Sequence, residues 1–334
     1  MPLLLAPMED VSDPPFRHLC KKYGADMLYT EFISADGLIR DADKSMKKLD
    51  IYDDERPIGI QIFGGEEDAM VRSAAIVEEA NPDVLDINYG CPVKNVVCRN
   101  AGSGILRDID KMVALTAAIV KGTKLPVTVK TRLGWDDSTI RIVEVAERLQ
   151  DIGIHAISIH CRTKHQMYTG SARWEWIEKV KANPRLKIPV FGNGDINTPE
   201  KAIDMVKKYG ADGVMIGRAS IGHPFIFREI KHFIKTGEHH APPTLAERLD
   251  ACRTHLLKSV EWKGDRVGIF EMRRHYAPYF AGLPHIKPFR SRLVVADTIN
   301  DVFEILNELE IHFSKEENLT FVSAEKPVYL GYDA

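Results

Sequence analysis

Eight short runs of mostly apolar and β-branched residues, separated by segments of helical periodicity, most strongly restrict how this 334-residue chain can fold. Such runs are typical of buried strands, and amphipathic segments with a period near 3.6 residues are typical of surface helices. The strand predictions cover residues 3–8, 27–30, 58–63, 84–88, 127–131, 156–160, 190–192 and 213–217. The helix predictions between them cover residues 66–80, 108–120, 139–152 and 199–209.

Two of the predicted helices have clear boundary residues. Gly153 and Gly210 follow the third and fourth helices, where glycine commonly ends a helix. Thr198 and Pro199 are a suitable N-cap and first turn for the fourth. Strands that alternate with helices in this way predict an α/β fold, a (β/α)8 TIM barrel over residues 1–235. A doubly wound open sheet has the same alternation and remains the alternative architecture.

The pattern changes after the predicted barrel. Residues 236–244 form a polar, proline-containing linker of the kind that separates domains. We expect residues 245–313 to form a small all-helical domain, because no β-like runs occur there, and Pro284 and Pro288 to interrupt it. Residues 314–334 show no strong pattern and are expected to form a C-terminal tail. The helix predictions in this part cover residues 245–263, 266–281, 289–295 and 299–313.

Charge is distributed unevenly between the two parts. The whole chain has a net charge of −3, which is not typical of a nucleic-acid-binding domain. Between residues 253 and 292, however, nine Lys and Arg side chains stand against three acidic ones, a net charge of +6. A positive patch on an acidic protein is expected of a surface that binds a polyanion. The alternative is an ordinary solvated helix face.

The cysteines and the apolar runs restrict the class of protein. No apolar run approaches the roughly 20 residues of a membrane span, and the N-terminus lacks the basic segment of a secretory signal. We therefore expect a cytoplasmic protein that does not bind membranes. No group of His, Cys, Asp and Glu residues has convincing metal-ligand spacing, so no metal is predicted. The five cysteines contain no CxxC pair, and they are Cys20, Cys91, Cys98, Cys161 and Cys252.

One cysteine stands in an unusual frame. Cys91 lies between Gly90 and Pro92, directly after the predicted strand 84–88, and these two neighbours turn the chain where the strand ends. The thiol is therefore expected at the carboxyl end of a strand, where α/β barrels and open sheets carry their chemistry. The alternative is a small buried cysteine that fills a gap in the core.

The residues around Cys91 resemble the active-site loop of the tRNA-dihydrouridine synthases, flavoenzymes that reduce selected uridines in transfer RNA. The resemblance begins at Asn88-Tyr89-Gly90-Cys91-Pro92 and continues, after a basic and valine-containing spacer, into Ala101-Gly102-Ser103-Gly104. Further matching segments follow in the family order at residues 6–17, 61, 130–132, 159–163, 192–196 and 215–219. The resemblance covers residues 3–310 and is closest to the bacterial B-type branch.

Two predicted loops suit a phosphate. Asn193, Gly194 and Asp195 follow the seventh predicted strand, and Gly217 and Arg218 follow the eighth. In a barrel these two loops commonly bind phosphate through glycine amides, and an arginine can add a charge-assisted contact. The glycines are also ordinary turn residues. A cofactor with one phosphate fits these loops, and the resemblance implies FMN.

Further polar residues are predicted at other strand ends. Lys130 ends the fifth strand, where a buried ammonium needs an acceptor, and Gln61 offers both a donor and an acceptor. His160 ends the sixth strand, and a satisfied core histidine is the alternative there. No Gly-x-Gly-x-x-Gly follows a strand, so NADPH or NADH is expected only as a transient electron donor. The resemblance implies that Gln61, Lys130 and His160 line the flavin, against which Pro7, Met8 and Glu9 pack largely through their backbone.

The resemblance also implies a mechanism. NADPH reduces the flavin and leaves, an extruded uridine accepts hydride at C6, and Cys91 protonates C5. Such an acid must hold its proton at neutral pH, which suits a thiol with a pKa near about 8.5. Asn88 would bind the uracil edge, and Arg162 would bind the uracil or its phosphate. Two cysteines depart from the family pattern: Cys98 stands where a basic residue is common, and Cys161 replaces a glycine for a reason we cannot explain.

The basic helical segment is the predicted tRNA surface. Arg273 and Arg274, followed by His275, Tyr276 and Tyr279, interleave basic and aromatic groups that can bind phosphates and stack on bases. The resemblance implies that the C-terminal helices bind tRNA. No obligatory protein partner is evident from the sequence.

Two other functions remain open at the level of sequence. An FMN-dependent barrel oxidoreductase acting on a small cyclic substrate, like dihydroorotate dehydrogenase, would explain the flavin residues but not the basic helices. A non-catalytic RNA-binding protein on an inherited barrel would explain the helices but not Cys91, Lys130 and both phosphate loops.

Overall fold

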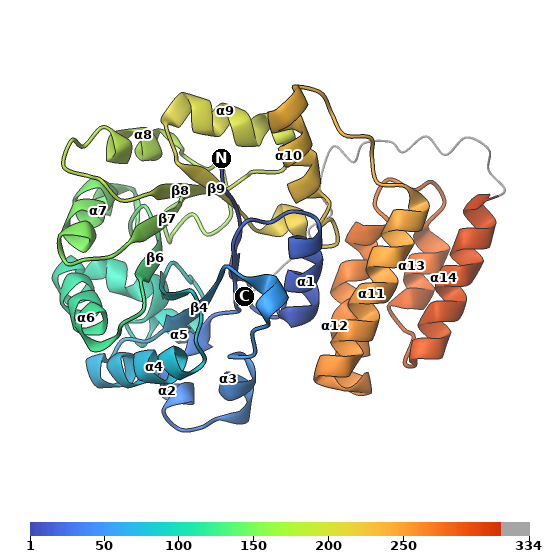
Figure 1. Cartoon of the computed structure of the whole chain (residues 1–334), viewed down its shortest axis with the longest axis horizontal. Helices are drawn as coiled ribbons and strands as arrows, with labels where there is room; N and C mark the ends of the chain where they lie inside the picture. The colour runs from blue at the N-terminus through green and yellow to red at the C-terminus, as the bar shows by residue number, and fades with distance from the viewer. Residues whose placement is uncertain (315–334) are drawn as a thin grey trace.

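The computed structural model describes residues 1–314 and closes the predicted strands into a barrel (Figure 1). The parallel strands run in the order β1-β9-β8-β7-β6-β5-β4-β2, and a parallel bridge between Leu4 and Met27 joins the two ends. This closure confirms the TIM barrel and rules out the open sheet. The strands are β1 Leu3–Leu5, β2 Leu28–Tyr29, β4 Ile58–Phe63, β5 Val84–Tyr89, β6 Val127–Arg132, β7 Ala156–His160, β8 Val190–Asn193 and β9 Gly213–Ile216.

The sequence did not indicate a further short strand, β3 (Ile33–Ser34), which pairs with β4 beside β2. It also gave no helix prediction for α1, although Asp13 accepts a hydrogen bond from the Phe16 amide as an N-cap and prolines occupy the first turn. Thr198 and Gly210 begin and end α9 as predicted. The helices of the barrel part are α1 Pro14–Lys22, α2 Ala35–Leu38, α3 Asp43–Lys47, α4 Glu67–Glu79, α5 Lys94–Val97, α6 Ile109–Gly122, α7 Ile142–Asp151, α8 Glu175–Lys181, α9 Pro199–Tyr209 and α10 Ile226–Thr236.

Apolar residues on alternate strand positions face the surrounding helices. On β5, Leu85 and Ile87 are fully buried in this outer core, and on β6 Val127 and Val129 join them. Because successive side chains of a strand point to opposite faces, the residues between them must face the barrel interior. A second, smaller apolar cluster that includes Leu4 lies within the strands, and it fills part of that interior.

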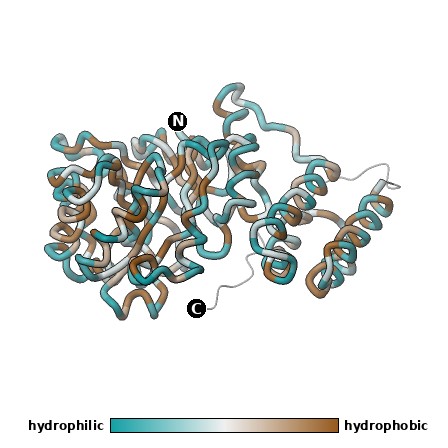
Figure 2. The backbone as a smooth tube through the Cα atoms, turned by 60° about the horizontal axis from the view of Figure 1, so that its bottom comes forward, coloured by the Kyte–Doolittle hydropathy of each residue, from teal (hydrophilic) through white to brown (hydrophobic). Residues whose placement is uncertain are grey.

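Residues 245–314 form a helical part. Its helices share a buried apolar cluster that also contains Leu19 of α1 and Tyr23 at the C-cap of α1, so this helical part packs directly against the barrel. In Figure 2, brown apolar stretches recur along these helices, as expected of amphipathic helices that share a core. The predicted tail lies outside the described residues except for Ser314. The helices are α11 Leu245–Lys263, α12 Asp265–Tyr279, α13 Lys287–Leu293 and α14 Ile299–Ser314.

None of the helices within residues 1–314 is long and apolar enough to span a membrane.

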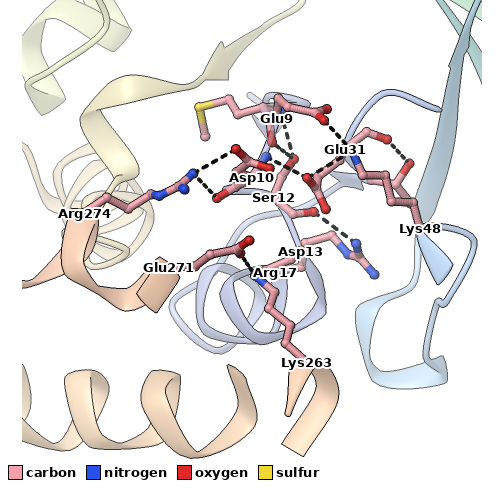
Figure 3. A network of polar contacts seen from close by, with 12 residues as sticks. Glu9, Asp10, Ser12, Asp13, Arg17, Glu31, Lys48, Lys263, Glu271 and Arg274 are labelled. Atoms are coloured by element: carbon pink, nitrogen blue, oxygen red, sulfur yellow. Dashed lines mark hydrogen bonds and ion pairs between the residues drawn. The ribbon is translucent and has the colours of Figure 1, made fainter. Parts of the chain in front are cut away.

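A buried ion pair ties the helical part to the barrel (Figure 3). The Lys263 ammonium, at the end of α11, contacts the carboxylates of Asp13 and Glu271. The Lys263 and Asp13 side chains are only 8% and 3% exposed. Burial acts to lower the pKa of Lys263, but the two carboxylates raise it above its usual value. Lys263 is therefore held as a cation at the junction.

We expect Lys263→Met to lower the free energy of unfolding by about 3–5 kcal/mol, because it leaves the Asp13 carboxylate buried without its cation. Urea denaturation measures the change. Lys22→Met is the matched control, because Lys22 pairs with Asp250 across the same α1–α11 contact at 3.2 Å but is well exposed. The control should cost less than about 1 kcal/mol. Similar losses in both variants would contradict this view of the junction.

Candidate active site

Polar side chains on the inner face of neighbouring strands form layers that rise to one mouth of the barrel. Asp86 of β5 is the register partner of Thr128 on β6, and one layer higher Asn88 is the partner of Lys130. At the top, Arg132 of β6 is paired in register with His160 of β7. The parallel strands therefore bring the predicted residues Asn88, Lys130 and His160 to a common edge.

The loop after β5 holds Cys91 rigidly. The amides of Gly90 and Cys91 both donate to Asn88 Oδ1 at 2.9 Å. From the other side, the amide and hydroxyl of Ser103 donate to the Cys91 carbonyl oxygen at 3.0 and 2.8 Å. Gly102 has a φ of +53°, and a Cβ there would lie 2.8 Å from the same oxygen. The Ala-Gly-Ser-Gly segment is therefore needed to pack against Cys91.

Burial controls the charge of the Cys91 thiol. Cys91 is 7% exposed, and burial raises its pKa above the usual value. A backbone hydrogen bond from Val93 and the positive charge of Arg132 act in the opposite direction without reversing the shift. The thiol therefore keeps its proton at neutral pH, as a general acid must.

Two basic side chains, Lys130 and His160, lie at this mouth of the barrel, and Lys130 is close enough to Cys91 for their charges to interact. Burial, and then the charge of Arg132, lowers the pKa of Lys130 to about 8, while Asp86 acts to raise it. The pKa of His160 is well below its usual value, mainly through burial and then through Arg132 and Lys130. Within residues 1–314 neither side chain donates to an acceptor. Donors that have no protein acceptor are free to bind an oxygen- and nitrogen-rich ring such as a flavin.

The loops after β8 and β9, which the sequence predicts to bind phosphate, lie in contact with each other. Asn193 Nδ2 donates to the Met215 carbonyl at 2.8 Å, so this side chain bridges the two strands. Asp195 Oδ2 accepts from Arg162 at 2.8 Å, and Asp195 Oδ1 lies 3.5 Å from Arg218. Gly194 has a φ of +122°, and a Cβ at Gly217 would touch Ala6 and Met8 at 3.4 Å. The glycine backbones are thus the parts of these loops best suited to approach a cofactor.

Arg162 lies beneath the loop that follows β7. It is 2% exposed and donates to the carbonyls of Thr169 and Gly170 at 3.1 and 2.6 Å. Its Nη1 is buried and has no partner among the described residues. Its contact with uracil or phosphate stays a prediction.

Arg132 and Tyr168 are site residues that sequence reasoning missed. Arg132 donates to the Gly90 carbonyl at 2.8 Å and to the Thr163 and Met167 carbonyls at 3.0 and 2.8 Å. It therefore fixes the Cys91 loop against the loop after β7. The exposed Tyr168 ring lies 5.5 Å from the Arg132 guanidinium and 4.7 Å from that of Arg218. The sequence did contain a signal for Arg132: side chains alternate along a strand, so Arg132 lies on the same face of β6 as Lys130.

The loop after β1, which contains Pro7, Met8 and Glu9, is held from two sides (Figure 3). On the barrel side, Lys48 bridges Glu9 at 2.6 Å and Glu31 at 3.4 Å, and the Asp10 amide donates to Glu31 at 2.6 Å. Burial is the main cause that raises the pKa of Glu31 to about 7. On the helical side, Arg274 Nη1 donates to the Asp10 carbonyl at 2.8 Å.

The predicted tRNA surface needs a correction. His275, Tyr276 and Tyr279 are 3%, 0% and 1% exposed, so the expectation that they stack on bases is wrong. They are buried because the apolar face of α12 packs on α11. Arg273 pairs with Asp297 at 2.8 Å. The roles of Arg273 and Arg274 in tRNA binding stay predictions.

The chain matches the model of the family described as Dihydrouridine synthase (Dus) over residues 4–318. The chain belongs to the dihydrouridine synthase family. It is 41% identical over 307 residues to "Probable tRNA-dihydrouridine synthase 1" of Synechocystis sp., a match that covers 92% of this chain and 85% of that protein. It is 40% identical over 290 residues to "tRNA-dihydrouridine synthase B" of Pseudomonas putida, which covers 87% of this chain and 86% of that protein. The resemblance seen in the sequence, including its B-type relatives, is confirmed.

Solved structures agree on the fold of this dihydrouridine synthase. Histamine dehydrogenase from Rhizobium sp. 4-9 superposes with a TM-score of 0.54 at 12% identity, over 76% of this chain and 48% of that one. A 2-naphthoyl-CoA reductase complex gives a TM-score of 0.54 at 11% identity, over 69% of this chain and 50% of the other. Identities this low support the barrel architecture alone.

Burial of the synthase's Cys91 predicts slow alkylation at neutral pH. Because its pKa is raised, the rate of reaction with iodoacetamide should keep rising with pH and level off only above about 8.5, the ordinary value for a free thiol. Peptide mass spectrometry over a pH series measures the rate, with the exposed Cys98 as an internal reference. Alkylation of Cys91 at neutral pH that matches or exceeds that of Cys98 would contradict the neutral, buried thiol.

Proposed function

We propose that this dihydrouridine synthase reduces the C5–C6 bond of specific uridines in tRNA, with FMN as cofactor, NADPH or NADH as electron donor and Cys91 as proton donor. Family membership supports the reaction class of a flavin-dependent oxidoreductase. The relatives from Synechocystis and Pseudomonas putida carry tRNA-dihydrouridine synthase names. The observation that carries the proposal is the buried Cys91 thiol, which hydrogen bonds from its loop hold at the barrel mouth close to the charges of Arg132 and Lys130.

The flavin contacts that we propose come from the polar side chains and glycine loops at the barrel mouth. Lys130 and His160 would donate to the ring, and Gln61, whose amide also bonds Asp86 and Asn88, would contact its pyrimidine edge. The Gly194 and Gly217 backbones, with Arg218, would hold the phosphate. Pro7, Met8 and Glu9 would pack along the ring, with Asn193 and Asp195 beneath the phosphate loops. When bound, the flavin supplies hydride for C6 of the uracil.

Cys91 would complete the reduction by moving its Sγ proton to C5 of the uracil. The transfer needs the thiol within hydrogen-bond reach of the carbon and a thiol that is protonated beforehand. The hydrogen bonds from the Cys91 loop to Asn88 and Ser103 restrict its position. Asn88 and Arg162 are the proposed uracil contacts. A small cyclic substrate would use the same groups but would leave the helical part without a role.

Cys91→Ala should slow uridine reduction by about 10²–10⁴-fold, the usual contribution of a positioned general acid. The protein should still fold and hold its flavin, because the change removes only a thiol. Single-turnover oxidation of the reduced flavin by unmodified tRNA measures the rate. Cys98→Ala is the matched control, since Cys98 is exposed seven residues later in the same loop. Loss of activity in the control and not in Cys91→Ala would assign the acid to Cys98.

We propose that tRNA binds along the basic face of the helical part, in the cytoplasm. Within residues 1–314, several of the predicted cations are neutralised by acidic partners, such as Arg253 by Glu310 and Arg292 by Glu308. Some form no ion pair in that part of the chain, which leaves their charge available for phosphates: Lys258, Arg266, Lys287 and Arg290.

The double variant Arg266→Glu, Arg290→Glu should weaken tRNA binding. The slope of log affinity against log salt should shrink by about 0.7–0.9 for each lost phosphate contact. Binding titrations at several salt concentrations measure both quantities. Reduction of the flavin by NADPH needs no RNA and should remain near normal. Arg148→Glu is the control, because Arg148 lies on the outer helix α7 and pairs with Asp110. An unchanged salt slope in the double variant would place the RNA surface elsewhere.

A further inference from the structure

A carboxylate lies inside the barrel below the proposed flavin site. Asp86, on the inner face of β5, is 1% exposed. Its Oδ1 accepts from Thr128 Oγ1 at 2.5 Å, and its Oδ2 accepts from Gln61 Nε2 at 2.5 Å. An ionised carboxylate can only accept hydrogen bonds, so Asp86 requires Gln61 to turn its NH2 group inward. The Gln61 carbonyl oxygen must then point the other way.

That oxygen contacts the residue that holds the catalytic loop. Asn88 Nδ2 donates to Gln61 Oε1 at 2.9 Å. Asn88 Oδ1 accepts from the amides of Gly90 and Cys91. Backbone amides can only donate, so Asn88 must turn its Oδ1 toward them. The hydrogen bond from Asn88 Nδ2 to the Gln61 carbonyl oxygen requires the same orientation of the Asn88 amide. Asp86, Gln61 and Asn88 thus form one polar chain from a buried charge to the Cys91 backbone. Every hydrogen bond in this chain runs the same way, because each group accepts from the next.

We propose that Asp86 is a positioning residue of the reaction, whose carboxylate acts through Gln61 and Asn88 to hold the Cys91 thiol where it can reach the uracil. This inference rests on the proposed function. Proton transfer requires the donor within hydrogen-bond reach of the acceptor, and a misplacement of about 1 Å can cost roughly 100-fold in rate. Asp86 touches neither the thiol nor the proposed substrate contacts, so it can affect the position of the thiol only through the polar chain.

The charge of Asp86 has a second consequence in the same site. It is the carboxylate that acts to keep Lys130 protonated against burial and against Arg132. Burial raises the pKa of Asp86 itself to about 6, but the hydrogen bonds from Thr128 and Gln61 and the charge of Lys130 oppose that rise. Asp86 therefore remains mostly ionised at neutral pH, which is the state that orients Gln61.

The test is a double-mutant cycle on the full-length flavoprotein. The variants are Asp86→Ala, Asn88→Ala and the double variant, and the rate is that of single-turnover flavin oxidation by tRNA. Asp86→Ala should slow this step by roughly 10–100-fold. If Asp86 acts through Asn88, it should have little further effect in the Asn88→Ala background, whereas independent effects would multiply. Multiplying effects would overturn the proposal.

Tyr89→Phe is the matched control for a merely structural effect. Tyr89 is the next residue on β5 after Asn88 and is fully buried, but its hydroxyl bonds Thr116 Oγ1 at 2.8 Å on the outer face of the strand. This variant loses a buried hydrogen bond from the same strand and leaves the polar chain intact. It should keep the tRNA-dependent rate within about threefold of the parent, the effect of a modest stability loss. A loss as large as that of Asp86→Ala would overturn the positioning role.

A second measurement does not depend on the reaction. Hydrogen exchange of the Gly90 and Cys91 amides should be roughly three- to tenfold faster in Asp86→Ala than in the parent or in Tyr89→Phe, because their acceptor is no longer held. Unchanged exchange would overturn the proposal. If Asp86→Ala does not fold, Asp86→Val, which fills the site but cannot accept a hydrogen bond from Gln61, goes through the same cycle and the same criterion applies. Failure of tRNA to oxidise the parent flavin would instead reject the proposed function, and exchange would still decide the role of Asp86.

Discussion

The alternation of side chains along parallel strands is the constraint on which this site depends. In a closed barrel each strand gives every second residue to the interior, and all the strands end at the same mouth. On β6 this puts Thr128, Lys130 and Arg132 on the inner face, while Val127 and Val129 pack under the helices. The outer residues stabilise the fold by burial, and the inner ones can carry chemistry without weakening that core.

The mouth concentrates positive charge in a place where it is poorly solvated. Burial is the main cause that lowers the pKa values of Lys130, Arg132 and His160. The charge of Arg132 lowers those of Lys130 and His160 further. One buried carboxylate, Asp86, opposes it from below. An environment of this kind suits an electron-rich, anionic partner such as a reduced flavin. Burial meanwhile keeps the Cys91 thiol neutral, although cations lie nearby.

The loop after β1 connects this mouth to the helical part. Asp10 contacts Arg274, and Asp13 contacts Lys263, while Lys48 holds the same loop from the barrel side (Figure 3). The loop expected to pack against the flavin is therefore also the joint that orients the helices. Lys263 and Arg274 belong to the basic segment that the sequence predicts as the RNA surface, and in this joint both pair with carboxylates.

The sequence by itself determined the alternation of strands and helices, because eight apolar runs alternate with helical segments, and it placed Cys91 at a strand end through Gly90 and Pro92. Only the closure of the strands decided between a barrel and an open sheet. The sequence also singled out Lys130 and His160 as candidates, because their polarity is conspicuous at the end of a buried strand. It did not reveal the role of Asp86, which looked like part of an apolar run, because the partners Gln61 and Thr128 stand on other strands. Nor could it tell an arginine that pairs with a carboxylate, such as Arg273 with Asp297, from one such as Arg266 that forms no ion pair within residues 1–314. Hydrogen bonds and ion pairs between residues far apart in the chain exist only once the barrel closes and the helices dock, so only the tertiary structure decided them.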